Sequence, residues 1–397
     1  MKVIIWDNFV LKQAGGPSGY LYNLKKFIDL EKKSNINIEF LFKCEDKEEN
    51  KIKNKIKSII PTKVSNYFKL FHYFKRIIIQ EKISEDKYKK ILNSDIIHFH
   101  STYSYYRNLK KLKNYKGKII VSSHSPQPFY QEIVEDICKF DLKKFPNFFL
   151  KLLATPDYIA FEQADYLIFP CKEALEPYIN RDENIKRIFI KNKNKIKYYL
   201  TGIEKIKINE NNDYMKKFQI PNNAVVISYI GRHTKIKGYD LVIRFAKKIL
   251  EKYDNVFFII GGNYNEHLDT FKHERFINLG WTKEGKEIIK NSDLFLLPNR
   301  ETYFDLIFLE VLSMGTPILC SDTGGNKFFK KFNSEDIIYF ENENLLDLEL
   351  KYQEYIFKRS KIRNKFLKNA EIFDQNFDIL KSGYKYLDTL KGIYNEK

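Results

Sequence analysis

Residues 292–325 have the sequence SDLFLLPNRETYFDLIFLEVLSMGTPILCSDTGG, and this stretch does most to define the fold. The apolar runs at 294–298 and 317–321 have the length and composition of buried strands. Between them, the run at 305–315 is apolar on every side, starts at an aspartate and ends at a glycine followed closely by proline, as helices do. Strand, helix and strand in this order predict two parallel strands joined by a crossover helix.

Glu310 is the one charged residue inside this apolar helix. An ionised carboxylate in such a place is costly unless hydrogen-bond donors satisfy it. Either the protein or a ligand must therefore supply those donors. Asp305 is expected to cap the helix, because its carboxylate can accept from the free amides of the first turn.

Strand and helix patterns alternate along the whole chain, which favours parallel sheets with crossover helices. Since 397 residues exceed what one core usually serves, we expect two domains, divided in the polar stretch near residue 205. The predicted fold class is α/β, with two doubly wound, Rossmann-like parallel sheets that face a central cleft. The predicted strands lie at 2–6, 38–42, 96–100, 118–124, 166–170, 225–231, 256–262, 275–280, 294–298 and 317–321.

The formal charge of +18 is concentrated in one region. Residues 51–90 hold twelve Lys and Arg against three Asp and Glu, mixed with aromatic residues. Three interpretations stay open: a solvated helix, a patch that binds anionic lipid headgroups, or a nucleic-acid surface, which no accompanying motif supports. The chain has neither an apolar signal at its start nor a run long enough to cross a bilayer. Its four cysteines are scattered, which favours a reducing cytosol: Cys44, Cys138, Cys171 and Cys320.

Several loops that follow predicted strands carry residues suited to a ligand. Gly15 and Gly16 precede a helix, whose N-terminus favours an anion such as phosphate, although the loop matches neither a Walker nor a dinucleotide motif. His124 follows a strand and could hydrogen-bond a sugar hydroxyl or polarise a reacting group, or it could be a structural histidine. His98 and His100 alternate on another strand, where we expect packing or support of a neighbouring side chain.

Phosphate chemistry is indicated more strongly in the second half of the chain. Arg232 and Lys237 lie on a short strand-to-helix loop and together can neutralise a diphosphate. Gly324 and Gly325 follow a later strand and offer backbone amides to the same phosphates. No Asp-x-Asp pair ends a strand, so we expect neither a bound metal nor another cofactor.

At these residues the chain resembles glycosyltransferase family 4, which has the GT-B fold. IGRHTKIKGYDLVI, at 230–243, resembles the family's GR…KG.D.LI segment. The stretch at 292–325 resembles its long ADxFxLPS…EGFGLxxLEAMAxGxPVxxSxxGG segment. The resemblance covers nearly the whole chain, with looser matches at the Gly15–Gly16 loop and at His124.

The resemblance implies a retaining, metal-independent transferase that uses a nucleotide diphosphate sugar. It implies an acceptor-binding domain at 1–205, a nucleotide-sugar-binding domain at 206–378, and a terminal helix at 379–397 that packs back on the first domain. Residues implied to be catalytic are His124 near the sugar and Arg232 and Lys237 at the diphosphate. Residues implied to bind the donor are Gly15, Gly16, Arg232, Lys237, Glu301, Thr302, Glu310 (at the ribose), Gly324 and Gly325.

One departure from the family pattern affects sugar recognition. The family places a glutamate eight residues before the second one, and that position is Thr302 here, with Glu301 one place too early. Either Glu301 turns towards the sugar, or the neutral hydroxyl of Thr302 takes its role.

The expected function is transfer of a sugar to a glycan or lipid-linked acceptor in bacterial surface polysaccharide or lipopolysaccharide synthesis. The expected location is the cytoplasm, with a peripheral position on an anionic membrane through 51–90 as an option. The alternatives are a sugar-nucleotide epimerase of the same fold and a non-catalytic, basic membrane-binding module. The nucleotide, the sugar, the linkage and the oligomeric state are left open.

Overall fold

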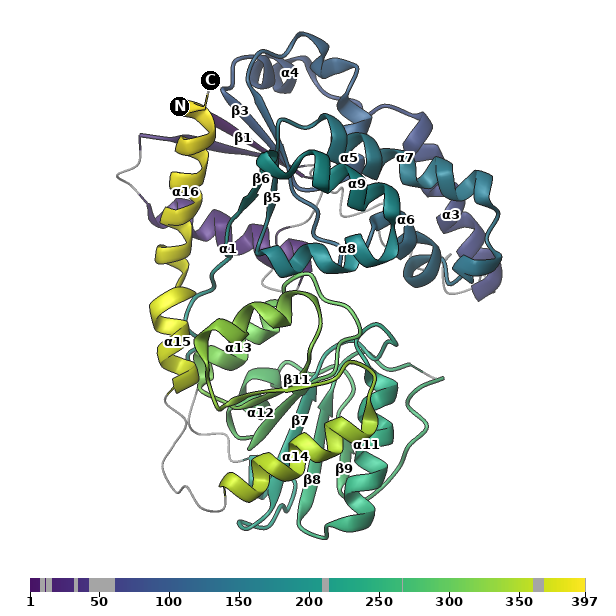
Figure 1. Cartoon of the computed structure of the whole chain (residues 1–397), viewed down its shortest axis with the longest axis vertical. Helices are drawn as coiled ribbons and strands as arrows, with labels where there is room; N and C mark the ends of the chain where they lie inside the picture. Colours follow the sequence, from purple (N-terminus) through teal and green to yellow (C-terminus); the bar gives the residue numbers. More distant parts are fainter. Residues whose placement is uncertain are drawn as a thin grey trace. The chain divides into compact units, whose positions relative to one another are not determined.

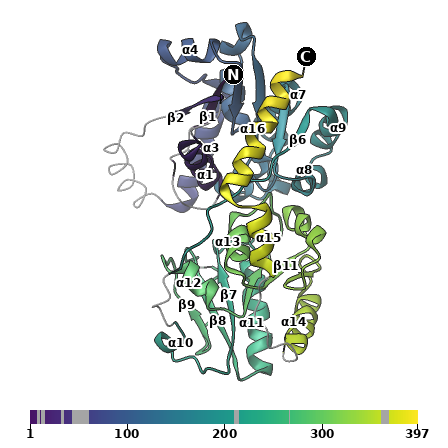
Figure 2. The same cartoon turned by 90° about the vertical axis from the view of Figure 1, so that its left-hand side faces the viewer.

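The structure is a computed structural model, and it describes residues 1–7, 11, 16–31, 35–42, 61–208, 214–265, 267–359 and 368–396. The chain forms two compact units, one of Met1–Leu200 with Gly383–Lys397 and one of Thr201–Ser382 (Figures 1 and 2). We call them the N-terminal unit and the C-terminal unit. Each contains a parallel six-stranded sheet between helices, which confirms the predicted α/β fold of two doubly wound domains.

The sheet of the N-terminal unit has the strand order β2-β1-β3-β4-β5-β6. The chain therefore reverses direction across the sheet between β1 and β3, and in open sheets of this type ligands bind beyond the carboxyl ends of the strands at such a point. Its strands are β1 (Lys2–Asp7), β2 (Asn37–Phe42), β3 (Ile96–Phe99), β4 (Lys118–Val121), β5 (Tyr166–Phe169) and β6 (Ile196–Tyr198).

Helices surround this sheet, and the last helix of the chain, α16, packs against the first, α1. A side chain at Gly383 on α16 would begin 2.2 Å from the ring of Phe27 on α1, so the two helices approach closely there. The helices of this unit are α1 (Gly16–Leu30), α3 (Thr62–Ile78), α4 (Glu85–Leu92), α5 (Thr102–Asn108), α6 (Phe129–Glu132), α7 (Asn147–Gln163), α8 (Glu176–Arg181), α9 (Glu183–Lys191) and α16 (Ile379–Asn395), which starts in the C-terminal unit.

The sheet of the C-terminal unit has the order β12-β11-β10-β7-β8-β9, so its switch point lies between β7 and β10. α11 and α14 pack into the main core on one face of the sheet, while α12 contacts β7 and α13 on the other. Its elements are α10 (Tyr214–Lys217), β7 (Val225–Ile230), α11 (Tyr239–Lys252), β8 (Val256–Gly261), β9 (Phe276–Asn278), α12 (Gly285–Lys290), β10 (Leu294–Leu297), α13 (Leu306–Met314), β11 (Ile318–Ser321), β12 (Ile337–Phe340), α14 (Leu345–Arg359) and α15 (Lys368–Asn376).

All ten strands predicted from the sequence are present, and the stretch at 292–325 forms β10, α13 and β11 as expected. Gly315 ends α13 in the left-handed conformation, with φ of 76°. β6 and β12 were not predicted. They are short strands of three and four residues at sheet edges, and each is only partly buried, so neither shows the continuous apolar pattern of the central strands.

Candidate functional site

The candidate donor site lies at the switch point of the C-terminal sheet, where β7 and β10 are neighbours. The loop after β7 meets the loop after β10 in close contact. Gly238 has φ of 67°, and a Cβ there would lie 1.8 Å from the carbonyl oxygen of Pro298. Only glycine fits both the conformation and the space, so this residue sets how closely the two loops approach.

Arg232 and Lys237 lie on the loop after β7, as predicted. The Arg232 side chain is exposed, whereas Lys237 is partly buried and donates to both carboxylate oxygens of Asp305, at 2.8 and 2.7 Å. Asn299 also donates to Asp305. The loops after β7 and β10 therefore join through an ion pair between residues 68 positions apart.

The predicted role of Asp305 as a helix cap is wrong in one respect. Asp305 stands at the N-cap position of α13 with extended backbone, but its side chain makes no capping hydrogen bond. Its carboxylate is bound to Lys237 instead, because a full positive charge is a stronger partner than a helix amide. A negative charge is thus held beside the predicted diphosphate-binding lysine.

Arg300 is a residue of this site that the sequence did not single out. Its guanidinium forms a two-point pair with Asp240 on α11, at 2.7 and 2.8 Å, and also donates to the Lys235 carbonyl and to Glu343. The hydrogen bonds to Asp240 and Glu343 outweigh burial and raise the pKa of Arg300. Arg300 therefore fixes the loop that carries Lys237. The only sequence signal was a basic residue at a strand end.

Glu310 lies on α13, on the side of the helix that is not fully buried. Burial raises the pKa of its carboxyl, an effect that the charge of Lys286 partly offsets. The oxygens of the Glu310 carboxylate are not among the buried side-chain atoms that lack a hydrogen-bond partner in the described residues. That a ligand supplies the donors to Glu310 stays a prediction.

The structure distinguishes Thr302 from Glu301. Thr302 is wholly buried, its hydroxyl has no hydrogen-bond partner in the described residues, and its carbonyl accepts from the amide of Gly325 at 3.1 Å. Glu301 is partly exposed. One oxygen of the Glu301 carboxylate is nevertheless buried, so which of the two residues faces a sugar stays open.

The two predicted glycine loops differ in their surroundings. Gly324 and Gly325 are buried beside the loop after β10, but the Gly325 amide is already bound to Thr302, and a Cβ at Gly325 would lie 2.2 Å from the Tyr303 carbonyl. Gly325 thus serves close packing in this state. Gly16 starts α1 in the N-terminal unit with φ of 73° and an open surrounding, and Gly15 lies outside the described residues.

Two exposed aromatic residues at the same sheet edge were also missed. Tyr264 follows β8 and Trp281 follows β9, and their loops are joined by a hydrogen bond from the Gly262 amide to the Gly280 carbonyl. Flat, exposed rings at the carboxyl ends of neighbouring strands can stack on a planar group. An aromatic residue soon after a strand-end glycine was the available signal.

His124 follows β4 in the N-terminal unit, where it meets residues from two other elements. Its Nε2 lies 2.9 Å from Nδ1 of His100, which follows β3, and the ring of Tyr20 of α1 packs against its ring at a tilt of 50°, with centroids 4.6 Å apart. His124 is thus held by its neighbours at the carboxyl edge of the sheet, where ligands of such folds bind.

Burial keeps three histidines of this unit neutral: His98, His100 and His124. It lowers the pKa of His98 and of His124 to about 3, and that of His100 well below its ordinary value. His98 is wholly buried between the hydroxyls of Tyr386 and Ser122. The expected supporting roles of His98 and His100 agree with these contacts.

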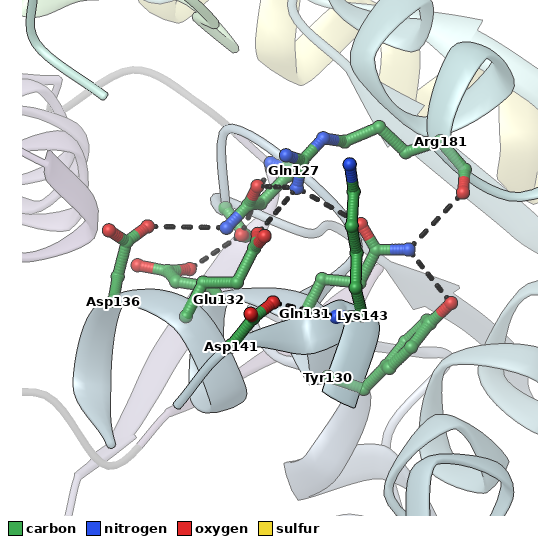
Figure 3. Close-up of polar contacts among 10 residues, drawn as sticks. Gln127, Tyr130, Gln131, Glu132, Asp136, Asp141, Lys143 and Arg181 are labelled. Atoms are coloured by element: carbon green, nitrogen blue, oxygen red, sulfur yellow. Dashed lines mark hydrogen bonds and ion pairs between the residues drawn. The ribbon is translucent and has the colours of Figure 1, made fainter. Parts of the chain in front are cut away.

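A network around Arg181 fixes the segment that follows β4 (Figure 3). Arg181, at the end of α8, donates to Gln127 and to Gln131, the latter at 3.0 Å, and pairs with Glu135 at 2.9 Å. Gln127 in turn donates to Asp136 at 3.2 Å. The segment passes through α6 and a π-helical turn at Ile133–Ile137, so the network holds an irregular surface next to the histidines.

The described residues contain no group of three or more His, Cys, Asp or Glu side chains placed to hold a metal ion. Nor does any helix among them have the length and apolar character needed to cross a membrane.

Residues 224–348 match the family model described as Glycosyl transferases group 1. O-antigen biosynthesis glycosyltransferase WclY of Escherichia coli is 26% identical over 198 residues, 47% of this chain and 52% of that protein. UDP-Gal:alpha-D-GlcNAc-diphosphoundecaprenol alpha-1,3-galactosyltransferase of E. coli is 31% identical over 134 residues, 31% of this chain and 35% of that protein. The matched regions thus span about half or less of these relatives.

The structure of HepE from Anabaena in complex with UDP-glucose is similar over 99% of this chain and 100% of that one, with a TM-score of 0.61 and 13% identity. The fold is therefore that of the GT-B glycosyltransferases. Within it, the candidate donor site lies in the segment that carries the group 1 glycosyl transferase pattern.

We predict that the N-terminal unit loses stability as pH falls from 7 towards 3. The unfolded chain protonates His98 near its ordinary pKa of 6.5, whereas the folded unit resists protonation down to about 3. The stabilisation is therefore present above pH 6.5 and is lost on acidification, by about 2 kcal/mol from His98 alone between pH 7 and 5.

Urea unfolding at pH 7, 6 and 5 measures this loss, with His98→Asn as the comparison. Burial raises the pKa of Asp157 to about 7, so acidification increases stability through this carboxyl. This contribution is the same in both proteins, and the difference between them therefore measures the contribution of His98. An equally steep loss in the variant and the wild type would contradict the prediction.

Proposed function

We propose that this chain is a retaining glycosyltransferase that moves a sugar from a nucleoside diphosphate sugar to a glycan or lipid-linked acceptor. The observation that carries the proposal is that two cations, Arg232 and Lys237, lie on the loop after β7 at the switch point of the C-terminal sheet, with Glu310 on α13 of the same unit. Arg232 and Lys237 suit a diphosphate, and Glu310 suits the two hydroxyls of a ribose. The family match at 224–348 includes all three residues.

In this proposal the cations stabilise the leaving group. Breaking the bond between the sugar and the diphosphate adds negative charge to the terminal phosphate, and preorganised positive charge lowers the cost of that change. Lys237 is held by Asp305 at 2.7 Å, so a bound phosphate either shares the lysine with this carboxylate or replaces it. Arg300 keeps the lysine loop in place during the exchange.

We propose further that the reaction needs no metal ion and retains the anomeric configuration. The side chains of Arg232 and Lys237 can supply the positive charge that a divalent cation supplies elsewhere. The acceptor hydroxyl would enter on the face from which the diphosphate leaves, and a phosphate oxygen would take its proton. Such a displacement needs no carboxylate nucleophile, consistent with Thr302 at the position of the family's first glutamate.

The acceptor is proposed to bind the N-terminal unit near His124. Two of the matched E. coli proteins are named for O-antigen synthesis and for a diphosphoundecaprenol-linked acceptor. These names favour a lipid-linked glycan of a bacterial surface polysaccharide. Such an acceptor would place this protein at the cytoplasmic face of a membrane.

The exposed face of α3 supports a membrane-bound position. Leu70 and Ile77 pack into the unit, while a stripe on the opposite side stays exposed at spacings of three, four and seven residues. Lys75 lies within that stripe, and the apolar residues of this aromatic surface are Val64, Tyr67, Phe68, Phe71 and Ile78, between 45% and 75% exposed.

A second exposed aromatic pair continues this surface at the start of α7. Phe149 contacts Phe74 of α3, with ring centroids 5.3 Å apart, and Phe148 beside it is 73% exposed. Aromatic rings with lysines between them match the interface of an anionic bilayer. The basic run at 51–60, part of the sequence-based prediction, lies outside the described residues.

A transfer assay with candidate UDP- and GDP-sugars, in the presence and absence of lipid-linked glycans, tests the function, and UDP-sugars are expected to serve. We predict that Glu310→Gln weakens donor binding about tenfold, because an ionic acceptor of ribose hydroxyls is lost. The ligand-free variant should be at least as stable as the wild type, since a charge that burial disfavours is gone.

Thermal unfolding with and without UDP or GDP separates the two effects. Loss of stability without ligand would show that Glu310 is structural. Epimerisation of the nucleotide sugar without acceptor would identify an epimerase instead, and abolition of transfer by EDTA with recovery by Mg²⁺ would refute the metal-independent mechanism.

We predict that the protein co-sediments with vesicles containing phosphatidylglycerol at low salt, and weakly with phosphatidylcholine alone. Phe68→Ser with Phe71→Ser should lower the bound fraction about tenfold, since two rings that enter the bilayer interface are removed. Leu346→Ser with Leu350→Ser, on exposed positions of α14, is the matched control. Equal binding by both double variants, or no preference for anionic lipid, would exclude the aromatic surface as the membrane contact.

A further inference from the structure

The carboxyl ends of β3 and β4 bring together three histidines: His98, His100 and His124. The rings of His98 and His100 pack at a centroid distance of 4.0 Å, and those of His100 and His124 lie nearly parallel, 13° apart, with a nitrogen-to-nitrogen distance of 2.9 Å. A hydrogen bond between two neutral imidazoles needs a proton on one nitrogen and a lone pair on the other. The surroundings of the cluster decide which ring donates.

The tautomer of His98 follows from its two partners. The hydroxyl of Ser122 donates to the carbonyl of Ile168 at 2.9 Å, because a carbonyl can only accept. The same hydroxyl lies 2.8 Å from Nε2 of His98, so this nitrogen carries the proton and donates to Ser122. Nδ1 of the neutral ring then accepts from the phenol of Tyr386 at 2.8 Å.

His98 is therefore locked from both sides, by β4 and by the C-terminal helix α16. Burial also raises the pKa of Tyr386 well above its ordinary value, so the phenol keeps its proton and stays a donor. The locked His98 ring in turn forms one wall of the space that holds His100. Among the described residues, the ring of Tyr20 lies against His100 and His124, and Tyr199 lies against Tyr20 and Tyr386.

His100 has one nitrogen with a partner and one without. Its Nδ1 meets His124, while its Nε2 is buried and lacks any hydrogen-bond partner in the described residues. If His124 donated, the proton of neutral His100 would lie on Nε2 as a buried N–H without an acceptor. Orphaned buried N–H groups are rarer than unsatisfied acceptors and forfeit a full hydrogen bond to water.

We propose that His100 is a positioning residue that donates from Nδ1 to Nε2 of His124 and thereby fixes His124 as the Nδ1–H tautomer. With Nε2 accepting from His100 and Nδ1 carrying the proton, neither ring nitrogen of His124 has a lone pair that could take a proton. His124 is therefore not the base that deprotonates the acceptor.

This role rests on the proposed function only for the identity of the substrate. The low pKa of His124 agrees with it, because a ring that stays neutral through the physiological range carries a single N–H proton, and its hydrogen bonds determine which nitrogen holds that proton. Because His124 in this tautomer takes up no proton, the proton of the acceptor hydroxyl is left to an oxygen of the phosphate in the nucleotide sugar.

Long-range ¹H–¹⁵N NMR of the free protein, with ¹⁵N-labelled histidine, reads the tautomers directly. The chain has seven histidines, and single substitutions assign the signals. At pH 7 we expect the proton of His124 on Nδ1 and that of His98 on Nε2, with no titration of either between pH 8 and 5. A proton on Nε2 of His124 in the wild type would overturn the proposal, whether or not any transfer is detected.

Two substitutions test the consequence for catalysis. His100→Leu removes the donor and should give His124 a mixture of tautomers, with kcat about tenfold lower or more and a smaller change in KM. His100→Asn can donate from nearly the same place, so it should keep the Nδ1–H signal and retain more of kcat than the leucine variant. An unchanged Nδ1–H signal in folded His100→Leu would refute the positioning role. If the wild-type signals are as expected but no sugar donor is turned over, the proposed function fails and the tautomer assignment stands.

Discussion

The close contact between the loops after β7 and β10 is the constraint on which the candidate donor site depends. Gly238 touches the Pro298 carbonyl because both loops leave neighbouring strands at the switch point of the sheet. Within that contact, Arg300 binds Asp240 and the lysine loop, and Lys237 binds Asp305. The same few residues thus set both the position of the Lys237 side chain and the charge around it. A small shift in either loop would move the cation that is proposed to meet the diphosphate.

In both units, side chains near the expected ligand site are neutral or paired with an opposite charge, and this arrangement costs some folding stability. Burial raises the pKa of the Glu310 carboxyl, and Nε2 of His100 is buried without a hydrogen-bond partner among the described residues. A buried nitrogen without a partner lowers stability, so its presence just after β3 fits a site selected for binding and not for packing. By contrast, the Lys237–Asp305 pair keeps the lysine ordered and partly neutralised until an anion competes for it.

The fold was largely predictable from the sequence, and the details of the site were not. The central strands and α13 are continuous apolar runs with clear endings, so 292–325 alone indicated a parallel sheet. β6 and β12 were not predicted, because short edge strands are half exposed and lack a continuous apolar run. Asp305 was expected to cap α13 because the rules for helix ends consider only neighbouring residues. They contain no information about Lys237, which lies 68 residues away in the sequence. For the same reason the link between His100 and His124 needed the pairing of β3 with β4.

The most direct test of the account is the affinity for a nucleoside diphosphate against its monophosphate. Calorimetry would compare UDP with UMP, or GDP with GMP, in the wild type and in Lys237→Gln. The account predicts that the wild type binds the diphosphate at least about tenfold more tightly, and that the variant loses most of this preference, because the second phosphate is held by the cations at the switch point. Equal affinities in the wild type, or a preference that survives without Lys237, would contradict it.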